Sequence, residues 1–329
     1  MKMSFAHNLP FALYILFIAC CSQQAHDQSD RLIGFAPDQE VTLQRISLGT
    51  GKKYRLKGLA IDPKNQMAYL GSWDQKVIVS VSLIDQTCSE INTPYNGKLN
   101  GMGTYLKGNR LYAVMNEVDD RPDANAISAL VIIDLVNGEL IGSYESVGKN
   151  GRNHFNHVVV DDQGVAYVSN TLKSNILTVD TNDASDSLKV FLEDSSLSWV
   201  HGIDLNPDNN RLFTTAYKGG IRIVDLQTGR FLPYRNMTHT SNDGLKYYRG
   251  SLYGVGHNTL IRYQLSKEED DIIKIDTLLH DHEYFNDPRC LHIESGWLYC
   301  LANIDYEPGP YHQRKTPLND SYLVKLRVD

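Results

Sequence analysis

One strand–turn–strand pattern recurs six times along the chain, and this repeat constrains the fold more than any other feature of the sequence. Each copy has two short apolar strands around a turn, then a loop and a β-branched third strand. The turns lie at Asp62, Leu106, Asp161, Asn206, Tyr248 and Glu294, which are 42 to 55 residues apart. Strand triplets at this period, without an amphipathic helix between them, are typical of a β-propeller. The sequence therefore predicts an all-β, six-bladed β-propeller.

The sixth copy ends at its third strand, so its blade needs a further strand from elsewhere in the chain. Residues 40–48 alternate between polar and apolar side chains and precede the first copy. We expect this N-terminal segment to form the fourth strand of blade six and to close the ring, because closure removes an exposed sheet edge. The propeller would then occupy residues 35–329.

The first 34 residues resemble an export signal followed by a tether. Lys2 precedes an apolar run over residues 9–19, which is too short to span a bilayer and is typical of a signal peptide. The small residue before Cys20 resembles a bacterial lipobox, although Phe17 replaces the usual Leu. We expect a signal peptide at 1–19 and a lipidated tether at 20–34, acylated at Cys20, on a protein of the bacterial envelope. Plain secretion after cleavage near the same place is the alternative.

The charge balance limits the kinds of partner that the protein can have. The chain has 32 Lys and Arg against 39 Asp and Glu, a formal net charge of −7. A nucleic-acid binder driven by charge needs a basic face, so we expect no nucleic-acid partner. The composition is that of an ordinary soluble domain. We expect a monomer that meets the membrane only through its lipid anchor.

Polar residues at corresponding positions of the six copies predict a binding site on the propeller axis. The first strand of each blade lines the axis, so the residues that lead into it face one shared mouth. These residues are Lys57, Gly101, Asn156, His201, Asp243 and Arg289, with Asn100, His157, Asn242 and Asp287 beside them. Convergent polar groups favour a small-ligand site. The alternative is that each residue only caps a turn. Two long inserts, 116–125 and 304–315, are expected over the same mouth.

Three segments carry a resemblance to a known superfamily. They read NHFNHVVVD at 153–161, HGID at 201–204 and NDGL at 242–245. With them, residues 40–329 resemble the superfamily of gluconolactonases and senescence marker proteins, with paraoxonases as more distant relatives. The resemblance implies a six-bladed propeller with a divalent metal, usually calcium, on its axis.

The metal ligands implied by the resemblance are only partly present. Asp243 matches the ligand from blade five, and Asn156 matches the pocket Asn of blade three. Lys57 stands at the position of the blade-one Glu, and His201 at that of the blade-four Asn. A metal set of Asp243, His201 and Asn156 would suit a borderline ion such as zinc better than calcium. Lys57 argues against any metal, because its ammonium would lie beside Asp243.

Two functions from different classes follow from these residues. The resemblance implies hydrolysis of a lactone or related ester, with Asp243 or His201 as general base for water and Lys57 or a metal stabilising the oxyanion. The other candidate residues would then bind a lactone, ester or sugar-like ligand. The alternative is a non-catalytic surface propeller that binds a small ligand or a partner protein, because this fold hosts both kinds of protein.

The last hairpin contains two of the cysteines. A three-residue loop with Gly296 in the left-handed conformation would pair Ile293 with Trp297. Counting back along both strands sets Cys290 opposite Cys300. The pair is then either a cross-strand disulfide, as an oxidising compartment allows, or two reduced core cysteines.

Overall fold

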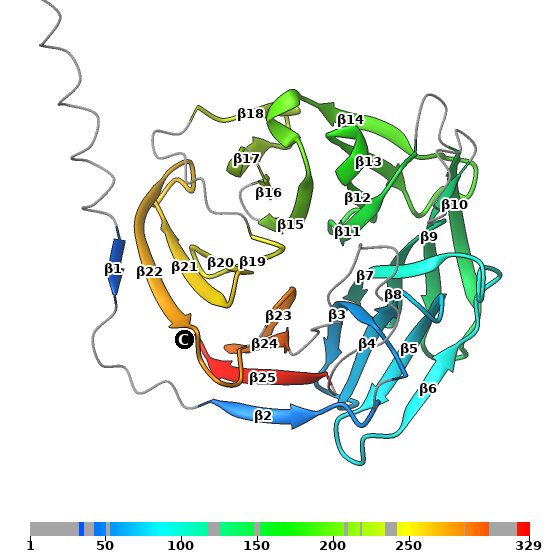
Figure 1. Ribbon diagram of the computed structural model, residues 1–329. Helices are drawn as coiled ribbons and strands as arrows, with labels where there is room; N and C mark the ends of the chain where they lie inside the picture. The colour runs from blue at the N-terminus through cyan, green and yellow to red at the C-terminus, as the bar shows by residue number, and fades with distance from the viewer. Residues whose placement is uncertain are drawn as a thin grey trace, which may run out of the picture.

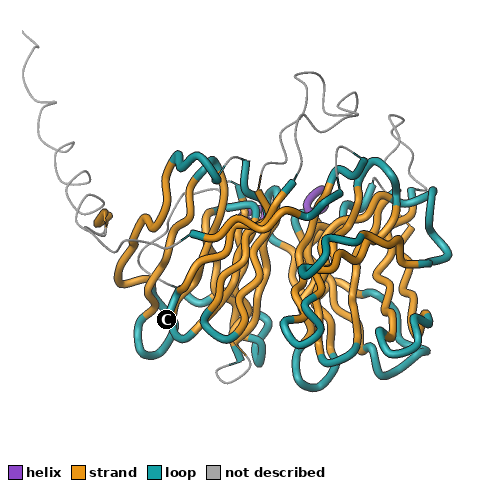
Figure 2. Tube along the Cα trace, turned by 90° about the horizontal axis from the view of Figure 1, so that it is seen from below, coloured by secondary structure: helices purple, strands orange, loops and turns teal. Residues whose placement is uncertain are grey.

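The protein forms six antiparallel sheets arranged as blades around a central axis (Figure 1). This computed structural model describes residues 33–35, 43–50, 53–117, 126–147, 152–206, 210–217, 219–233, 242–285, 287–302 and 321–329. Seen from the side, the strands run between the two faces of the ring (Figure 2). The predicted all-β, six-bladed β-propeller is confirmed.

Each blade begins at the axis and is built outward, one strand after another, in chain order. Blade one contains β3 (Leu56–Asp62), β4 (Met67–Ser72), β5 (Val77–Ser82) and β6 (Cys88–Ile91). Blade two contains β7 (Asn100–Lys107), β8 (Arg110–Asn116), β9 (Ile127–Asp134) and β10 (Leu140–Val147). Blade three contains β11 (Phe155–Val160), β12 (Val165–Asn170), β13 (Asn175–Asp180) and β14 (Lys189–Glu193).

The second half of the chain repeats this arrangement. Blade four contains β15 (Val200–Asn206), β16 (Arg211–Ala216), β17 (Gly220–Asp225) and β18 (Arg230–Phe231). Blade five contains β19 (Gly244–Tyr248), β20 (Ser251–Gly256), β21 (Thr259–Leu265) and β22 (Ile272–His280). Blade six contains β23 (Cys290–Glu294), β24 (Trp297–Ala302) and β25 (Tyr322–Arg327).

An N-terminal strand completes blade six, as the sequence predicts. β2 (Gln44–Ser47) pairs antiparallel with β25, with Ile46 opposite Leu323. The first and last parts of the chain therefore share one sheet, which closes the ring. A further short strand, β1 (Ile33–Phe35), runs parallel to β22 at the outer edge of blade five. This pairing could not be predicted, because three residues are too few to show a strand pattern.

The apolar core consists of six clusters, and each lies between two neighbouring blades. The cluster between blades six and one contains Leu48, Leu56, Leu301 and Leu323, all fully buried. A blade is thus held mainly through its two faces, and no blade has a core of its own. Residues that lead into β3 and out of β2 contribute directly to ring closure.

Four of the six innermost strands carry one extra residue near the same end. In blade one, Lys57 pairs with Gly71 and Ala60 pairs with Tyr69. The chain therefore advances three residues along β3 while it covers only two residues of β4. The same shift occurs in β7, β11 and β15. Such β-bulges bend a strand and re-aim its side chains. The sequence placed the candidate residues just before the first strands, whereas in these four blades they lie inside the strands, at the bulge.

The hairpin of blade six differs from its predicted register. Glu294 pairs with Trp297 across a two-residue turn, so Leu291, not Cys290, lies opposite Cys300. Because neighbouring strand residues point to opposite faces, Cys290 and Cys300 join different core clusters. Both are buried free cysteines. The predicted disulfide is therefore wrong, and the alternative of two reduced core cysteines holds.

The helices of the described residues are two short 3-10 turns, η1 (Thr171–Lys173) and η2 (Ser195–Leu197). Neither has the length or apolar character that a membrane-crossing helix needs, and no other helix is present in the described ranges. Cys20, residues 20–32 of the tether and most of the two inserts lie outside the described residues, so their predictions stay predictions; Ile33 and Gly34, expected in the tether, form part of β1.

Candidate functional site

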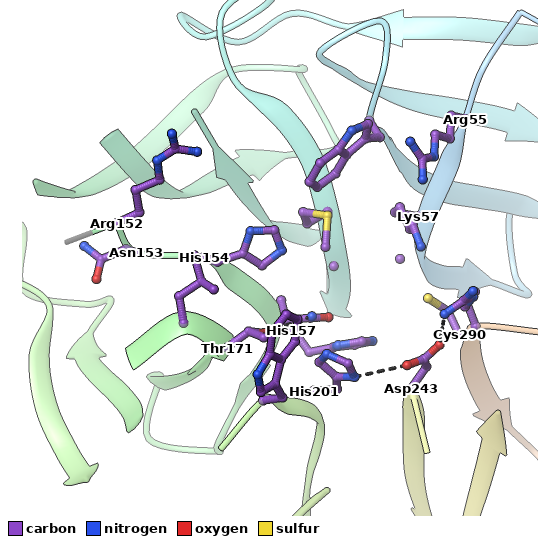
Figure 3. Close-up of a pocket in the computed structure, with 18 of the residues that line it drawn as sticks. Arg55, Lys57, Arg152, Asn153, His154, His157, Thr171, His201, Asp243 and Cys290 are labelled. Atoms are coloured by element: carbon purple, nitrogen blue, oxygen red, sulfur yellow. Dashed lines mark hydrogen bonds and ion pairs between the residues drawn. The ribbon is translucent and has the colours of Figure 1, made fainter. Parts of the chain in front are cut away.

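A cavity of about 550 Å³ opens at one end of the axis, where the bulged ends of the innermost strands converge (Figure 3). Six of the predicted candidates line it: Lys57, Asn156, His157, His201, Asp243 and Arg289. Every blade contributes, because the loops and strand ends of all six meet at the axis. The lining also includes apolar side chains such as Met102 and Leu172, so the cavity has both charged and apolar walls.

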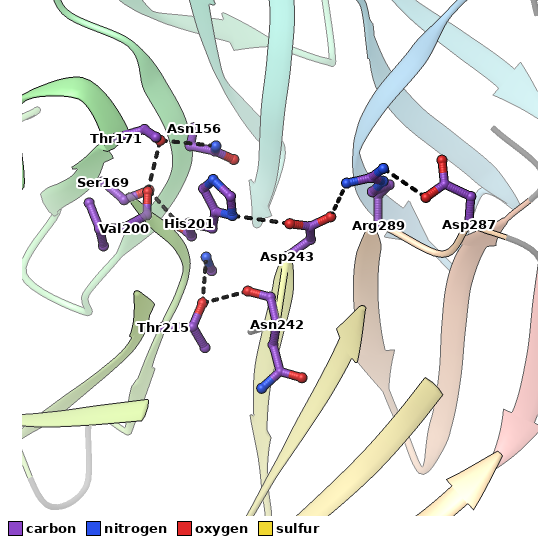
Figure 4. Close-up of polar contacts among 11 residues, drawn as sticks. Asn156, Ser169, Thr171, Val200, His201, Thr215, Asn242, Asp243, Asp287 and Arg289 are labelled. Atoms are coloured by element: carbon purple, nitrogen blue, oxygen red, sulfur yellow. Dashed lines mark hydrogen bonds and ion pairs between the residues drawn. The ribbon is translucent and has the colours of Figure 1, made fainter. Parts of the chain in front are cut away.

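A chain of polar contacts crosses the site from Asp287 in blade six through Arg289 and Asp243 to His201 in blade four (Figure 4). Asp287 lies 2.7 Å from one guanidinium nitrogen of Arg289, and another nitrogen of Arg289 bonds to Asp243 Oδ2. The other oxygen of Asp243, Oδ1, lies 3.0 Å from His201 Nδ1. Both carboxylate oxygens of Asp243 are thus occupied by neighbouring side chains, and the His201 ring is fixed through its Nδ1.

The surroundings of Asp243 keep its carboxylate ionised. Burial alone would raise the pKa of Asp243, but the hydrogen bond from His201 and the charge of Arg289 outweigh it. Lys57 acts in the same direction, so the pKa lies well below the ordinary range for Asp. A fixed negative charge beside Nδ1 selects the tautomer that carries its proton there, which leaves Nε2 as the basic atom.

Two further histidines in the cavity are neutral at ordinary pH. Burial, aided by nearby positive charge, lowers the pKa of His154 to about 4 and that of His157 to about 3. His154 lies against Trp73, with 5.7 Å between ring centroids. The Nδ1 of His157 is buried and has no hydrogen-bond partner among the described residues. It is therefore a polar atom that a bound ligand or water could satisfy.

Lys57 reaches the cavity from the bulge of β3. Gly58 follows it with a φ of 65°, and a Cβ on that glycine would lie 2.4 Å from the carbonyl oxygen of Met102. Only glycine fits there, so the bulge and the direction of Lys57 are set together. Burial, the largest cause, and Arg289 lower the pKa of Lys57 and Asp243 partly offsets them, so that the pKa is about 8.

Asn156 is held by hydrogen bonds that link blades three and four. Its Nδ2 donates to Thr171 Oγ1 at 3.1 Å, and that hydroxyl donates to the Val200 carbonyl at 2.8 Å. In the same layer, Ser169 Oγ donates to the His201 carbonyl at 2.7 Å. These bonds fix the backbone on both sides of His201, which keeps its ring in register with Asp243.

Four predicted candidates, Gly101 among them, do not line the cavity. Asn100 is buried and its amide donates to the Trp73 carbonyl. Asn242 is also buried, and its amide donates to the Tyr263 hydroxyl at 2.9 Å, inside blade five. Asp287 reaches the site only through its ion pair with Arg289. Asn242 precedes Asp243 directly, and because side chains alternate along extended backbone, only one of the two can face the axis.

Several lining residues were not among the predicted candidates. They are Arg55, Trp73, Met102, Glu117, Arg152, Asn153, His154, Thr171, Leu172, Trp199 and Cys290. Most stand in loops at the mouth or at strand ends, where the strand period gives no direction for a side chain. His154 lies within the quoted segment 153–161, so the sequence did contain a signal for it.

The donor set does not fit the divalent metal that the resemblance implies. Calcium needs several hard oxygen ligands, but both oxygens of Asp243 are taken by Arg289 and His201. His201 Nδ1 faces Asp243, and the Lys57 ammonium would repel a cation. No group of three or more His, Cys, Asp or Glu side chains able to hold a metal occurs among the described residues. We therefore derive no step through a metal.

Comparisons with known proteins show similarity of structure alone. No protein family model matches the chain, and no curated protein matches it in sequence. Among solved structures, the major Malassezia sympodialis allergen Mala s 1 is 14% identical, with a TM-score of 0.64 over 86% of this chain and 95% of the allergen.

Two further neighbours hold small ligands. The PQQ-bound aldose sugar dehydrogenase of Streptomyces coelicolor is 14% identical, with a TM-score of 0.60 over 89% of this chain and 100% of the enzyme. An inactive virginiamycin B lyase of Staphylococcus aureus with quinupristin is 12% identical, with a TM-score of 0.56 over 88% and 100%. By its blades and by its likeness of fold to these structures, the chain is a six-bladed β-propeller.

Proposed function

We propose that the axial cavity hydrolyses a lactone or ester, with His201 as the general base for water. The observation that carries the proposal is the 3.0 Å contact between His201 Nδ1 and Asp243 Oδ1 inside a ligand-sized cavity. No described residue bonds His201 Nε2, and the side chain is 21% exposed. An imidazole oriented by a carboxylate, with its second nitrogen open to water, is the arrangement that general-base catalysis requires.

The reaction follows from the positions of His201 and Lys57. His201 Nε2 removes a proton from water while the water oxygen attacks the carbonyl carbon, and the imidazolium that forms is stabilised by Asp243. The carbonyl electron pair moves to oxygen, and the Lys57 ammonium stabilises that oxyanion. When the intermediate collapses, the bond to the leaving oxygen breaks, and His201 returns its proton to that oxygen. Arg289 and Asp287 act as positioning residues, since they hold Asp243.

The charge of the cavity supports a substrate with a negative group. Four cations line it, Arg55, Lys57, Arg152 and Arg289, against two carboxylates, Glu117 and Asp243. Glu117 also accepts a hydrogen bond from the Ile127 backbone at 3.1 Å. The histidines with lowered pKa are neutral and add no charge, so the excess of positive charge comes from the Arg and Lys side chains. We infer a lactone or ester that also bears a carboxylate or a similar anion.

The proposal extends to the enzymes whose chemistry the protein shares and to its location in the cell. We infer a chemistry like that of gluconolactonases, in which Lys57 and Arg289 supply the positive charge that a metal supplies in those enzymes. We infer further that the propeller is exported and anchored to a membrane of the bacterial envelope through Cys20.

A second candidate function is ligand binding without turnover. Trp199 at the mouth is 54% exposed and has a φ of 57°, a strained conformation for a bulky residue. Strained residues cluster where a fold clamps a ligand. Trp199 and Trp73 both line the cavity, and an aromatic platform is favourable for binding whether or not chemistry follows.

A paired assay separates the two functions. The chain has three tryptophans, of which Trp73 and Trp199 line the cavity, so quenching of intrinsic fluorescence reports binding. A panel of lactones and esters, each in an acidic and a neutral form, reports hydrolysis. We expect turnover of the acidic members, and His201→Asn should reduce kcat by roughly 10²–10⁴ while quenching remains. Quenching without turnover of any member by the wild type would favour the binding function.

A further inference from the structure

The amine of Lys57 occupies an unusual position for a lysine. In Figure 3 it lies inside the cavity, beside Arg55 and Asp243 and opposite Arg152. No carboxylate is within ion-pair distance of it among the described residues, since His201 and Arg289 occupy the oxygens of Asp243. A lysine amine in a closed, ligand-sized site, next to other cations and without a salt bridge, is the environment of lysines that attack carbonyl groups.

We propose that Lys57 captures an aldehyde or ketone as an imine, and that this ligand is elongated and carries an anionic group at its far end. The proposal goes beyond ester hydrolysis and does not depend on it, because it requires a C–N bond at Lys57 and no attack by water.

The bond changes balance without any further reactant. The lone pair of the neutral amine attacks the carbonyl carbon, and the carbonyl electron pair moves to oxygen, which takes a proton. That first proton comes from the nitrogen and gives a carbinolamine; a second proton on the hydroxyl lets the C–O bond break as water leaves, and the nitrogen then loses its second proton, so that one carbonyl and one amine give one imine and one water. His201, held by Asp243, is the group in the cavity that can supply a proton to the departing oxygen and take one from nitrogen.

Burial and two of the charged groups near Lys57 favour the neutral amine. Arg289 from blade six and Arg55, which lies just ahead of β3, lower the pKa of Lys57, whereas Asp243 from blade five raises it. The charge of Lys57 in turn lowers the pKa of His154 and of His157. With burial as the largest cause and Arg289 next, the pKa of Lys57 falls to about 8. The competing nucleophile, Cys290, is less available, because burial raises the pKa of its thiol to about 11.

The far end of the ligand is placed by Arg152. This residue lines the cavity on the side opposite Lys57, and it forms no ion pair among the described residues (Figure 3). The Trp73 ring lies between the two ends, 5.7 Å from the His154 ring and 5.7 Å from the Arg55 guanidinium. A flat or apolar body over Trp73 would join a carbonyl at Lys57 to an anion at Arg152.

Reductive trapping tests the proposal directly. The purified protein is treated at pH 7.5 with cyanoborohydride and either 4-formylbenzoate or benzaldehyde, and the adducts are mapped by peptide mass spectrometry. An amine with a pKa near 8 is unprotonated far more often at this pH than an ordinary lysine, so Lys57 should react at least about tenfold faster than the exposed Lys64. The rate at Lys57 should rise with pH to a midpoint near 8.

Variants separate the two parts of the proposal. Lys57→Arg keeps the charge but has no nucleophilic amine, so the fast adduct should vanish. Arg152→Gln should slow trapping of 4-formylbenzoate more than trapping of benzaldehyde, whereas Arg110→Gln, exposed at the start of β8, should change neither.

Two results would overturn it. If the wild-type protein is trapped at Lys57 no faster than at Lys64, Lys57 does not form the proposed imine. This result does not depend on whether the Lys57 variant folds. If Arg152→Gln slows trapping of both aldehydes equally, Arg152 does not bind an anionic end of the ligand. The trapping assay detects a covalent bond to Lys57, whereas the ester panel detects hydrolysis that depends on His201. Each proposal can therefore be refuted without the other.

Discussion

At the residue scale, Lys57 carries a stability cost that its position in the cavity explains. Its pKa of about 8 in the folded protein lies below the 10.5 of an unperturbed lysine, so the folded state holds this proton less tightly than the unfolded chain. The cost of the buried ammonium is therefore fully present below pH 8, and it disappears as the pH rises from about 8 toward 10.5. Functional sites commonly retain such costs.

Lys57→Met should consequently stabilise the protein, and do so in a pH-dependent way. We expect a melting temperature a few degrees above wild type at pH 7, and a smaller difference at pH 10, where the wild-type amine is neutral. Lys64→Met changes an exposed lysine in the first turn and should give no such trend. Differential scanning calorimetry at the two pH values measures both variants. An equal difference at pH 7 and pH 10 would contradict the assigned direction.

The same scale shows how far the sequence predicts the site. Asp243, His201 and Arg289 were found because blades repeat, and a repeat brings equivalent positions to one axis. Asn242 was also selected, but it points into blade five, since a strand turns neighbouring side chains to opposite sides. Trp199 and Arg152 could not be placed, because they stand in loops, whose paths depend on packing between blades and not on strand period.

At the element scale, the innermost strands approach one another so closely that glycine is required between them. A Cβ on Gly103 in β7 would lie 2.3 Å from the carbonyl oxygen of Asn156 in β11. This contact sets the distance between blades two and three at the height of the cavity. Backbone atoms on both sides cannot yield as a flexible side chain can.

Gly103→Ala should therefore lower the free energy of unfolding by about 1–3 kcal/mol, the range for overpacking in a core. It should also weaken fluorescence quenching by ligands, because Asn156 and His157 move with β11. Gly142→Ala in β10 is the matched control, since its new Cβ would meet only side-chain atoms, of Ile132 at 3.2 Å and of Tyr144 at 3.5 Å. Urea titration of both variants measures the difference, and equal midpoints would refute the argument.

Ring closure belongs to the same scale. Deleting residues 43–48 removes β2 and the fully buried Leu48, which leaves β25 as an open edge and exposes the core between blades six and one. We expect loss of soluble protein. Deleting residues 33–35 removes only β1 from the outer edge of blade five and should leave the yield near wild type. Similar yields for both deletions would show that β2 does not hold the ring.

At the scale of the whole molecule, the repeat made the fold predictable while the site remained only partly so. Six copies of one hairpin are compatible with few architectures other than a six-bladed propeller. The closing strand could be predicted because blade six lacks a fourth strand of its own. The register of the last hairpin was not fixed in this way, because two-residue and three-residue turns both suit Ser295 and Gly296. One residue of shift decided whether Cys290 and Cys300 face each other.

The position of the molecule in the cell gives the last prediction. A net charge of −7 disfavours adsorption to anionic headgroups. We propose that the lipid at Cys20 holds the protein at the membrane. Cys20→Ser should move the protein from the membrane fraction to the soluble fraction, whereas Cys21→Ser should not. Because the tether precedes the propeller, ligand quenching of Trp73 and Trp199 should be unchanged in both. A Cys20→Ser protein that still sediments with membranes would exclude this anchor.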